Sequence, residues 1–307
     1  MISLKGVSKN FGEIKAVDSV SIDAYEKEIL VLLGISGCGK TTTLKMINRL
    51  IETDSGTITI DGKNIRDGKP EDLRKSIGFV MQHAGLFPHY TIKKNIAIVP
   101  DLLGWNAKRI HDRTQELMQK LRLDPSLLNH YPHELSGGQQ QRVGIARALI
   151  ANTPILLMDE PFGALDAITK SAIHSEFKNL DELRNKTIIL VTHDIMEAFE
   201  LGHRICLMDK GHIIQIGTPN QMLYNPANNF VKDFFAHNRL LLEYKIAHLT
   251  DVIVFIKEPL SVAAQEQLRK SVTVLQALEV FGSDNKFNKD YELLLQAFNH
   301  YRKLKKA

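Results

Sequence analysis

The residue types best suited to chemistry lie in a short glycine-rich segment, residues 34–42. Its sequence is Gly-Ile-Ser-Gly-Cys-Gly-Lys-Thr-Thr, between an apolar run at 29–33 and a helical pattern at 44–50. Glycines let successive backbone N–H groups point inward, and a helix start adds positive dipole. We predict a phosphate-binding P-loop, in which Lys40 reaches the β- and γ-phosphates and Thr41 holds Mg²⁺. The predicted nucleotide-binding residues here are Gly34, Ser36, Gly37, Cys38, Gly39, Lys40, Thr41 and Thr42.

A second candidate group is the acidic pair Asp159 and Glu160, which closes the apolar run at 155–158. An all-apolar run is typical of a central parallel strand that is buried on both faces. Because side chains alternate along a strand, the two carboxylates should point in opposite directions. We interpret Asp159 as a ligand of Mg²⁺ and Glu160 as the group that faces the attacking water. The alternative is an acidic strand end in solvent.

Two further polar side chains follow apolar strand patterns. Gln82 follows the run at 77–81, and His193 follows the run at 187–192. In open α/β sheets, chemistry gathers at the carboxyl ends of strands, so both are candidate site residues. A lone histidine is usually structural, but one at this position in a nucleotide-binding fold is predicted to contact phosphate.

Residues 135–142 predict the start of a helix. Ser136 occupies the N-cap position, and Gly137 and Gly138 leave the first N–H groups uncovered. Such a helix start binds anions, and a plain helix cap is the alternative.

Phe11 lies at a turn within an alternating strand pattern over residues 1–25. The alternation is typical of half-exposed antiparallel strands. Phe11 is either a core aromatic or a ring that stacks on adenine, since a base offers a matching π-face.

Composition is that of a globular protein with a sizeable core. The 307 residues are 44% hydrophobic and 24% charged, with a formal net charge of +4, which argues neither for nor against nucleic acid. Cys38 and Cys206 are the two cysteines, and we expect reduced thiols. The N-terminus has no signal-peptide layout, and the apolar runs are shorter than the ~20 residues of a membrane helix. We therefore expect no transmembrane segment.

Together, these motifs resemble those of the ATP-binding subunit of ABC transporters. The resemblance assigns Walker A to 34–42, the signature motif to 135–139 and Walker B to 155–160. Residues 163–166 match the D-loop, which adds Asp166 to the nucleotide-binding set. The family's Q-loop glutamine, switch histidine and A-loop aromatic match Gln82, His193 and Phe11, although the family usually has tyrosine at the A-loop position.

The resemblance implies an α/β fold. Its parts are a P-loop NTPase (RecA-like) core, an antiparallel β subdomain and a helical subdomain at about 83–150. The ATPase domain would span 1–236, and 237–307 would form a small C-terminal extension, either α/β or helical.

The resemblance also implies a head-to-tail homodimer that binds ATP and Mg²⁺. Walker A of one subunit and the signature helix of the other would clamp one triphosphate. The implied catalytic residues are Glu160, His193 and Gln82. The implied metal ligands are Thr41, Gln82 and Asp159. The further implied nucleotide-binding residues are Phe11, Asp159, Ser136, Gly137, Gly138, Gln139 and Asp166.

A narrower resemblance is to the ATPases that import quaternary amines such as glycine betaine, choline and carnitine. It is carried by residues 41–51, 85–89, 131–134 and 225–231. It implies a transmembrane permease partner, with a fused or separate substrate-binding protein, and no nucleic acid. The chain would lie peripherally at the cytoplasmic face of the plasma (inner) membrane. Ergothioneine is an alternative cargo, and a soluble non-transport ABC ATPase, a regulatory module or an exporter are alternative classes.

The last seventy or so residues carry a weaker signal. Relatives of this kind often end in paired CBS domains, and the stretch after 240 is too short for two. Residues 271–281 resemble one CBS segment, so the extension is a candidate truncated or degenerate CBS-like region. Its basic end is predicted to be a solvated tail.

Overall fold

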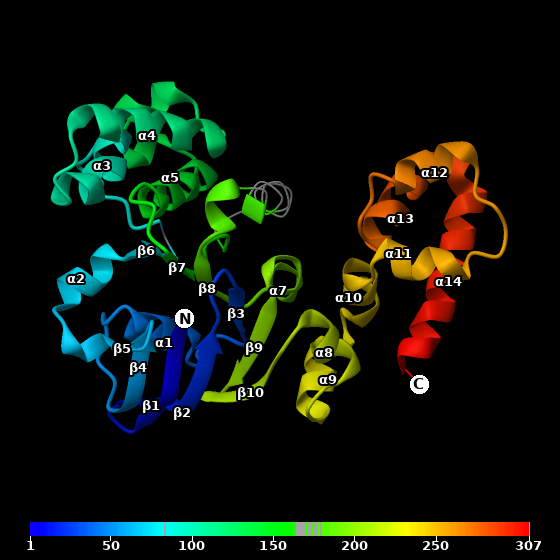
Figure 1. Cartoon of the computed structure of the whole chain (residues 1–307), viewed down its shortest axis with the longest axis horizontal. Helices are drawn as coiled ribbons and strands as arrows, with labels where there is room; N and C mark the ends of the chain where they lie inside the picture. The colour runs from blue at the N-terminus through cyan, green and yellow to red at the C-terminus, as the bar shows by residue number, and fades with distance from the viewer. Residues whose placement is uncertain (83, 164–169, 171–173, 175–176, 179, 307) are drawn as a thin grey trace. The chain divides into compact units, whose positions relative to one another are not determined.

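The computed structural model describes residues 1–82, 84–163, 170, 174, 177–178 and 180–306 (Figure 1). The chain divides into two compact units, Met1–Ile216 and Gly217–Ala307. The expected boundary after residue 236 therefore falls inside the second unit. No helix in these described ranges combines the length and apolar character that crossing a bilayer requires.

A six-stranded sheet with the order β10-β9-β3-β8-β7-β6 forms the core of the first unit. β3 pairs in parallel with β8 and β9, and β7 pairs in parallel with β6 and β8. Every residue of β7 and β8 is buried, as their unbroken apolar runs predict. The strands are β3 (Ile29–Leu33), β6 (Ile77–Val80), β7 (Ile155–Asp159), β8 (Thr187–Thr192), β9 (Arg204–Asp209) and β10 (His212–Gly217).

A four-stranded antiparallel sheet with the order β2-β1-β4-β5 confirms the alternating pattern near the N-terminus. Lys9 pairs with Val17 but Asn10 pairs with Lys15, so Ala16 is an extra residue that bulges from β2. The strands are β1 (Ile2–Phe11), β2 (Ile14–Ala24), β4 (Ser55–Ile60) and β5 (Lys63–Asn64).

Helices complete the first unit, and Figure 1 shows α3, α4 and α5 grouped together in teal and green, apart from the blue antiparallel sheet. The helical subdomain expected at about 83–150 includes two helices, α3 and α4, joined by a turn in which Gly104 has φ +70°. The α-helices are α1 (Lys40–Ile47), α2 (Pro70–Lys75), α3 (Ile92–Leu102), α4 (Ala107–Lys120), α5 (Gly137–Leu149) and α7 (Ile195–Leu201). Short 3-10 helices are η1 (Ile65–Asp67), η2 (Pro125–Asn129), η3 (Pro132–Glu134) and η4 (Asp181–Leu183).

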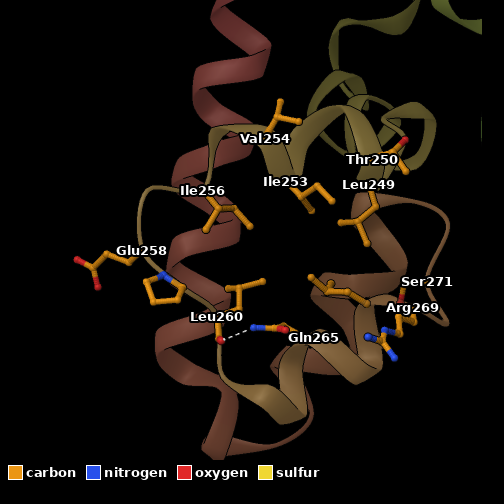
Figure 2. A pocket seen from close by; sticks show the side chains of 12 residues that line it. Leu249, Thr250, Ile253, Val254, Ile256, Glu258, Leu260, Gln265, Arg269 and Ser271 are labelled. Carbon is orange, nitrogen blue, oxygen red and sulfur yellow. Dashed lines mark hydrogen bonds between the residues drawn. The ribbon is translucent and has the colours of Figure 1, made fainter.

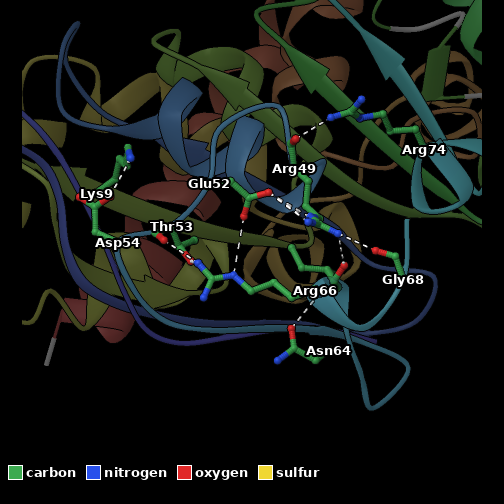
Figure 3. Close-up of polar contacts among 10 residues, drawn as sticks. Lys9, Arg49, Glu52, Thr53, Asp54, Asn64, Arg66, Gly68 and Arg74 are labelled. Atoms are coloured by element: carbon green, nitrogen blue, oxygen red, sulfur yellow. Dashed lines mark hydrogen bonds and ion pairs between the residues drawn. The ribbon is translucent and has the colours of Figure 1, made fainter. Parts of the chain in front are cut away.

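Arginines hold the end of α1, the helix that follows the glycine-rich loop (Figure 3). Arg74 donates to the carbonyl oxygens of Asn48 (3.2 Å) and Arg49 (2.6 Å). Arg49 in turn donates to the carbonyl oxygens of Ile65 (3.0 Å) and Gly68 (2.8 Å). Positive charge near a helix C-terminus is favourable, and Arg74 supplies partners for the two carbonyls that directly follow α1. The position of α1 is therefore tied to the segment that leads to β6.

A buried asparagine organises the segment between β6 and α3. The fully buried amide of Asn95 donates to the carbonyl oxygens of Phe87 (3.1 Å) and Tyr90 (3.0 Å) and accepts from Phe87 N–H (2.7 Å). Arg147 on α5 donates to Ala84 O at 2.6 Å. Both contacts satisfy backbone groups of a segment that has no regular structure of its own.

The second unit is helical in its described residues, apart from one isolated β-bridge between His248 and Thr273. Its own core includes Val252, Phe281 and Phe298. Its helices are α8 (Pro219–Tyr224), α9 (Asn229–Ala236), α10 (Arg239–Ile246), α11 (Leu249–Val252), α12 (Val262–Leu268), α13 (Val274–Gly282) and α14 (Asn288–Lys306), with 3-10 helices η5 (Ile253–Phe255) and η6 (Asn285–Phe287). The CBS-like hypothesis for this region stays a prediction.

An open groove of about 630 Å³ lies within the second unit (Figure 2). Its lining is mainly apolar and includes Leu249, Ile253, Ile256 and Leu260. Figure 2 shows Glu258 and Arg269 at opposite ends of this groove.

Lys186, directly before β8, is a lysine buried in the first unit. Its ammonium donates to Asn152 Oδ1 at 3.0 Å and to the carbonyl oxygen of Thr153. Burial and the positive charge of Arg113 lower the pKa of Lys186 to about 8, against the opposing charge of Glu182. Folding therefore favours loss of this proton.

This pKa predicts a pH-dependent stability. Unfolded lysine titrates near pH 10.4, so between about pH 8 and 10 the unfolded state binds more protons and stability rises with pH. We expect the unfolding free energy of the wild type, relative to Lys186→Met, to rise by at most about 1.4 kcal/mol per pH unit. Urea unfolding across this range measures it. The exposed-site variant Lys63→Met should show no such trend, and a flat difference for Lys186→Met would contradict the prediction.

Candidate nucleotide site

The glycine-rich loop between β3 and α1 is pressed between two backbone segments. A Cβ on Gly39 would lie 2.4 Å from the carbonyl oxygen of Ala16, and Gly39 has φ +103°. A Cβ on Gly34 would lie 2.3 Å from the carbonyl oxygen of Met208. Side chains are therefore excluded at both positions, and the loop backbone keeps a tight curve.

Lys40, the first residue of α1, folds into the curve of this loop. Its ammonium donates to the carbonyl oxygens of Gly34 and Ile35, both at 2.9 Å, and only 4% of the residue is exposed. An ammonium has three donors, and the third contacts Cys38 Sγ at 3.7 Å, a weak acceptor that a phosphate oxygen would displace. Burial raises the pKa of the neighbouring Cys38 thiol, although the positive charge of Lys40 acts in the opposite direction. The raised pKa keeps this thiol neutral.

Thr41 and Asp159, both predicted to be metal ligands, are in direct contact. The Thr41 hydroxyl donates to Asp159 Oδ1 at 2.7 Å, which joins α1 to the end of β7. Burial raises the pKa of Asp159, and the negative charge of Glu160 adds to this, while Thr41, Lys45 and Lys40 act in the opposite direction. A buried carboxylate beside a hydroxyl is a hard-oxygen donor pair, which fits Mg²⁺.

Thr41 and Asp159 bring two protein oxygens together at this point. In the part of the chain that the structure describes, no three His, Cys, Asp or Glu side chains form a ready-made metal cluster. Mg²⁺ is usually held by one or two protein groups together with substrate phosphates and water.

Residues that follow β6, β7 and β8 contact one another at Glu160. Gln82 Nε2 donates to Glu160 Oε2 at 3.0 Å, and His193 Nδ1 lies 3.2 Å from Glu160 Oε1. The structure therefore brings together the three residues predicted to be catalytic. The side chain of Glu160 is 17% exposed and that of His193 is 58% exposed, so the carboxylate is held at the edge of solvent.

The orientation of Glu160 has a different origin from the one predicted. β7 ends at Asp159, and Glu160 adopts φ +44°, so strand alternation does not set its direction. Its N–H still donates to Val191 O at 2.9 Å. A left-handed backbone in a non-glycine residue costs roughly 1–2 kcal/mol, and such residues gather at functional sites.

The signature segment begins α5 with a reciprocal cap. Ser136 Oγ accepts from Gln139 N–H at 3.3 Å, and Ser136 N–H donates to Gln139 Oε1 at 2.9 Å. The predicted N-cap role of Ser136 is thus confirmed. Within the ranges that the structure covers, no hydrogen bond or ion pair joins residues 136–139 to the P-loop of the same chain.

Phe11 is not a core aromatic, because 49% of it is exposed. It pairs across the β1–β2 hairpin with Ile14, which is 71% exposed. The same strand continues to Ala16, whose carbonyl oxygen faces Gly39. The hairpin thus presents two exposed apolar side chains beside the P-loop, and sequence reasoning missed Ile14.

The turn between β9 and β10 is a second feature that sequence reasoning missed. Gly211 N–H donates to Cys38 O at 3.1 Å, and Gly211 O accepts from Asp18 N–H at 2.9 Å. The sequence of residues 209–211 indicates a tight turn, and nothing local in it signals a contact with the P-loop. Asp166, the predicted D-loop residue, lies outside the described residues.

Comparison with known proteins identifies the class. A family model described as ABC transporter matches residues 17–163. The chain is 47% identical over 281 residues to the glycine betaine/carnitine/choline transport ATP-binding protein OpuCA of Bacillus subtilis (strain 168), covering 91% of this chain and 74% of that protein. It is also 47% identical over 281 residues to the glycine betaine uptake system ATP-binding protein YehX of Escherichia coli (strain K12), covering 92% and 90%.

Solved structures agree with this comparison. The chain resembles an ATP-binding cassette in a dimeric post-hydrolysis state bound to ADP and phosphate, with TM-score 0.65 and 36% identity. The match covers 71% of this chain and 98% of that one. The chain belongs to the ABC transporter family and is an ATP-hydrolysing subunit. The predicted family, fold class and enzyme class are confirmed.

The tight approach at Gly39 predicts the effect of a single methyl group. Gly39→Ala would force the loop away from Ala16, and we expect the affinity for ATP to fall about tenfold or more. Titration with a fluorescent ATP analogue measures this. Gly68→Ala is the matched control, because Gly68 has extended backbone and open space around it. Unchanged affinity in Gly39→Ala would count against the assigned loop geometry.

Proposed function

We propose that this chain energises the uptake of a quaternary-amine solute of the betaine type through a separate permease. The transport roles in the names of OpuCA and YehX, each 47% identical to this chain, support the solute class. The observation that carries the catalytic part is the convergence of Gln82, His193 and Glu160 at one sheet edge.

The P-loop supplies the phosphate site in this proposal. Lys40 and the backbone N–H groups around it hold the β- and γ-phosphates of ATP, and their positive charge stabilises the charge that develops on the transferred group. Thr41, Asp159 and Gln82 would hold Mg²⁺, which supplies further neutralisation of phosphate charge. Phe11 offers a ring face to adenine.

Glu160 is the group that orients the attacking water. Its carboxylate is fixed on one oxygen by Gln82 and on the other by His193, so its lone pairs are aimed rather than free to rotate. Such a positioned carboxylate accepts a hydrogen bond from water and aligns it for in-line attack. His193, the more exposed partner, is free to contact the γ-phosphate.

A second copy of the chain completes the site. The signature helix begins with uncovered N–H groups at Gly137 and Gly138, which suit the γ-phosphate bound by the other copy. Dimeric forms of a related cassette support this arrangement.

The permease is proposed to dock on the helical part of the first unit. Met81, Phe87 and Tyr131 are 48%, 44% and 41% exposed, and Met81 directly precedes Gln82. Exposed apolar side chains of this kind suit a protein partner. The chain would lie at the cytoplasmic face of the plasma (inner) membrane, held there by the permease, with no role for nucleic acid.

Replacing the carboxylate tests the role of Glu160. Glu160→Gln should keep ATP binding and trap a closed dimer, while hydrolysis falls at least about a hundredfold because the base is lost. Phosphate release and size-exclusion chromatography with ATP measure the two effects. Turnover within a few-fold of the wild type would refute this role.

Uptake tests the solute. Cells carrying this chain and its permease should accumulate labelled glycine betaine, and Glu160→Gln should abolish accumulation. Unlabelled choline, carnitine and ergothioneine as competitors rank the cargo. If no label enters while the purified chain hydrolyses ATP, the quaternary-amine proposal fails and the ATPase assignment stands.

A further inference from the structure

A covered ion cluster lies beside His193. The Lys170 ammonium lies 2.5 Å from Asp194 Oδ2 and 3.2 Å from Glu197 Oε2. The side chain of Lys170 is 17% exposed and that of Glu197 is 2% exposed. The side chain of Asp194 is 31% exposed, so solvent screens the Lys170–Glu197 pair less than the Lys170–Asp194 pair.

Asp194 connects this cluster to the backbone on both sides of His193. Its Oδ1 accepts from the N–H groups of Met196 (2.8 Å) and Glu197 (3.2 Å) and so caps α7. Its own N–H donates to Thr192 Oγ1 at 3.0 Å, and Thr192 is the last residue of β8. His193 is therefore a one-residue connection whose two neighbours are both fixed.

The direction of the His193 ring depends on this connection. More than half of the side chain is exposed, so packing contributes little to holding it. The ring nevertheless lies 3.2 Å from Glu160 Oε1, a contact that a small shift of the α7 start would break. Displacements of about 1 Å at a reacting centre cost roughly a hundredfold in rate.

The charges show why the lysine is needed. The hydrogen bond and charge of Lys170 hold the pKa of Asp194 below its usual range, although burial acts in the opposite direction. Burial raises the pKa of Glu197 even with the lysine present. His174 faces the same acid at 3.8 Å but also faces Glu200 at 3.6 Å, so it is shared between two carboxylates. Lys170 thus offsets the negative charge of the carboxyl groups at the start of α7.

We propose that Lys170 is a positioning residue for ATP hydrolysis, which sets the His193 ring against Glu160 by anchoring Asp194 and Glu197 at the start of α7. The inference rests on the proposed role of His193 in the reaction. Lys170 itself touches neither Glu160 nor the P-loop through any contact in the described part of the chain.

Steady-state kinetics of the full-length chain give the first test. Lys170→Ala should lower kcat about tenfold or more, with the KM for ATP changed by less than about twofold, because the P-loop is untouched. Lys170→Arg keeps the cation and should restore most of kcat. Asp194→Asn keeps an N-cap acceptor but loses the ion pair, so it should resemble Lys170→Ala. Lys178→Ala, at an exposed lysine nearby, is the control and should match the wild type.

A double-mutant cycle separates positioning from general destabilisation. If Lys170 acts through His193, adding Lys170→Ala to His193→Ala should lower kcat by less than about twofold. An equal loss in both backgrounds, or no rescue by Lys170→Arg, would overturn the inference and leave the proposed function standing. Wild-type activity in His193→Ala would instead overturn the proposed role of His193, and this inference with it.

Discussion

Parallel pairing among β6, β7, β8 and β3 is the constraint on which the site depends. Leu33 lies opposite Thr192, Asp159 opposite Val191, and Val80 opposite Met158. The register therefore brings the residues just beyond each strand to one edge of the sheet, where the P-loop, Gln82, Glu160 and His193 begin. A slip of one residue in any pair would turn the following side chains to the other face.

Polar contacts then fix the positions of α1 and the P-loop at this edge of the sheet. Thr41 and Asp159 join the first turn of α1 to β7, and Arg74 holds the far end of the same helix. The P-loop helix is thus fixed at both ends, while the loop before it is confined by backbone carbonyls on either side. Each charged group in the site is met by a partner that limits its motion, which lowers the reorganisation that catalysis requires.

Local signals allowed much of this site to be predicted from sequence. Short runs of neighbouring residues specify the strand ends, the glycine-rich turn and the Ser136 cap. The structure places these features as expected. The exposure of Phe11, the left-handed backbone of Glu160 and the pairing of Lys170 with Asp194 depend on segments distant in sequence, so no window of residues contains them. The hydrophobic periodicity of the second unit is too weak to distinguish an α/β fold from a helical one. Its helices depend on N-caps and a small shared core.

The buried Asn95 has a mechanical consequence. The Asn95 side chain binds the backbone at Phe87 and Tyr90, and Arg147 binds it at Ala84, so the segment 84–90 is held at three points. A force on the exposed Phe87 ring would therefore move this segment as a unit instead of bending it. Conversely, a rearrangement around Glu160 that moves this segment would change the shape of the surface around Phe87.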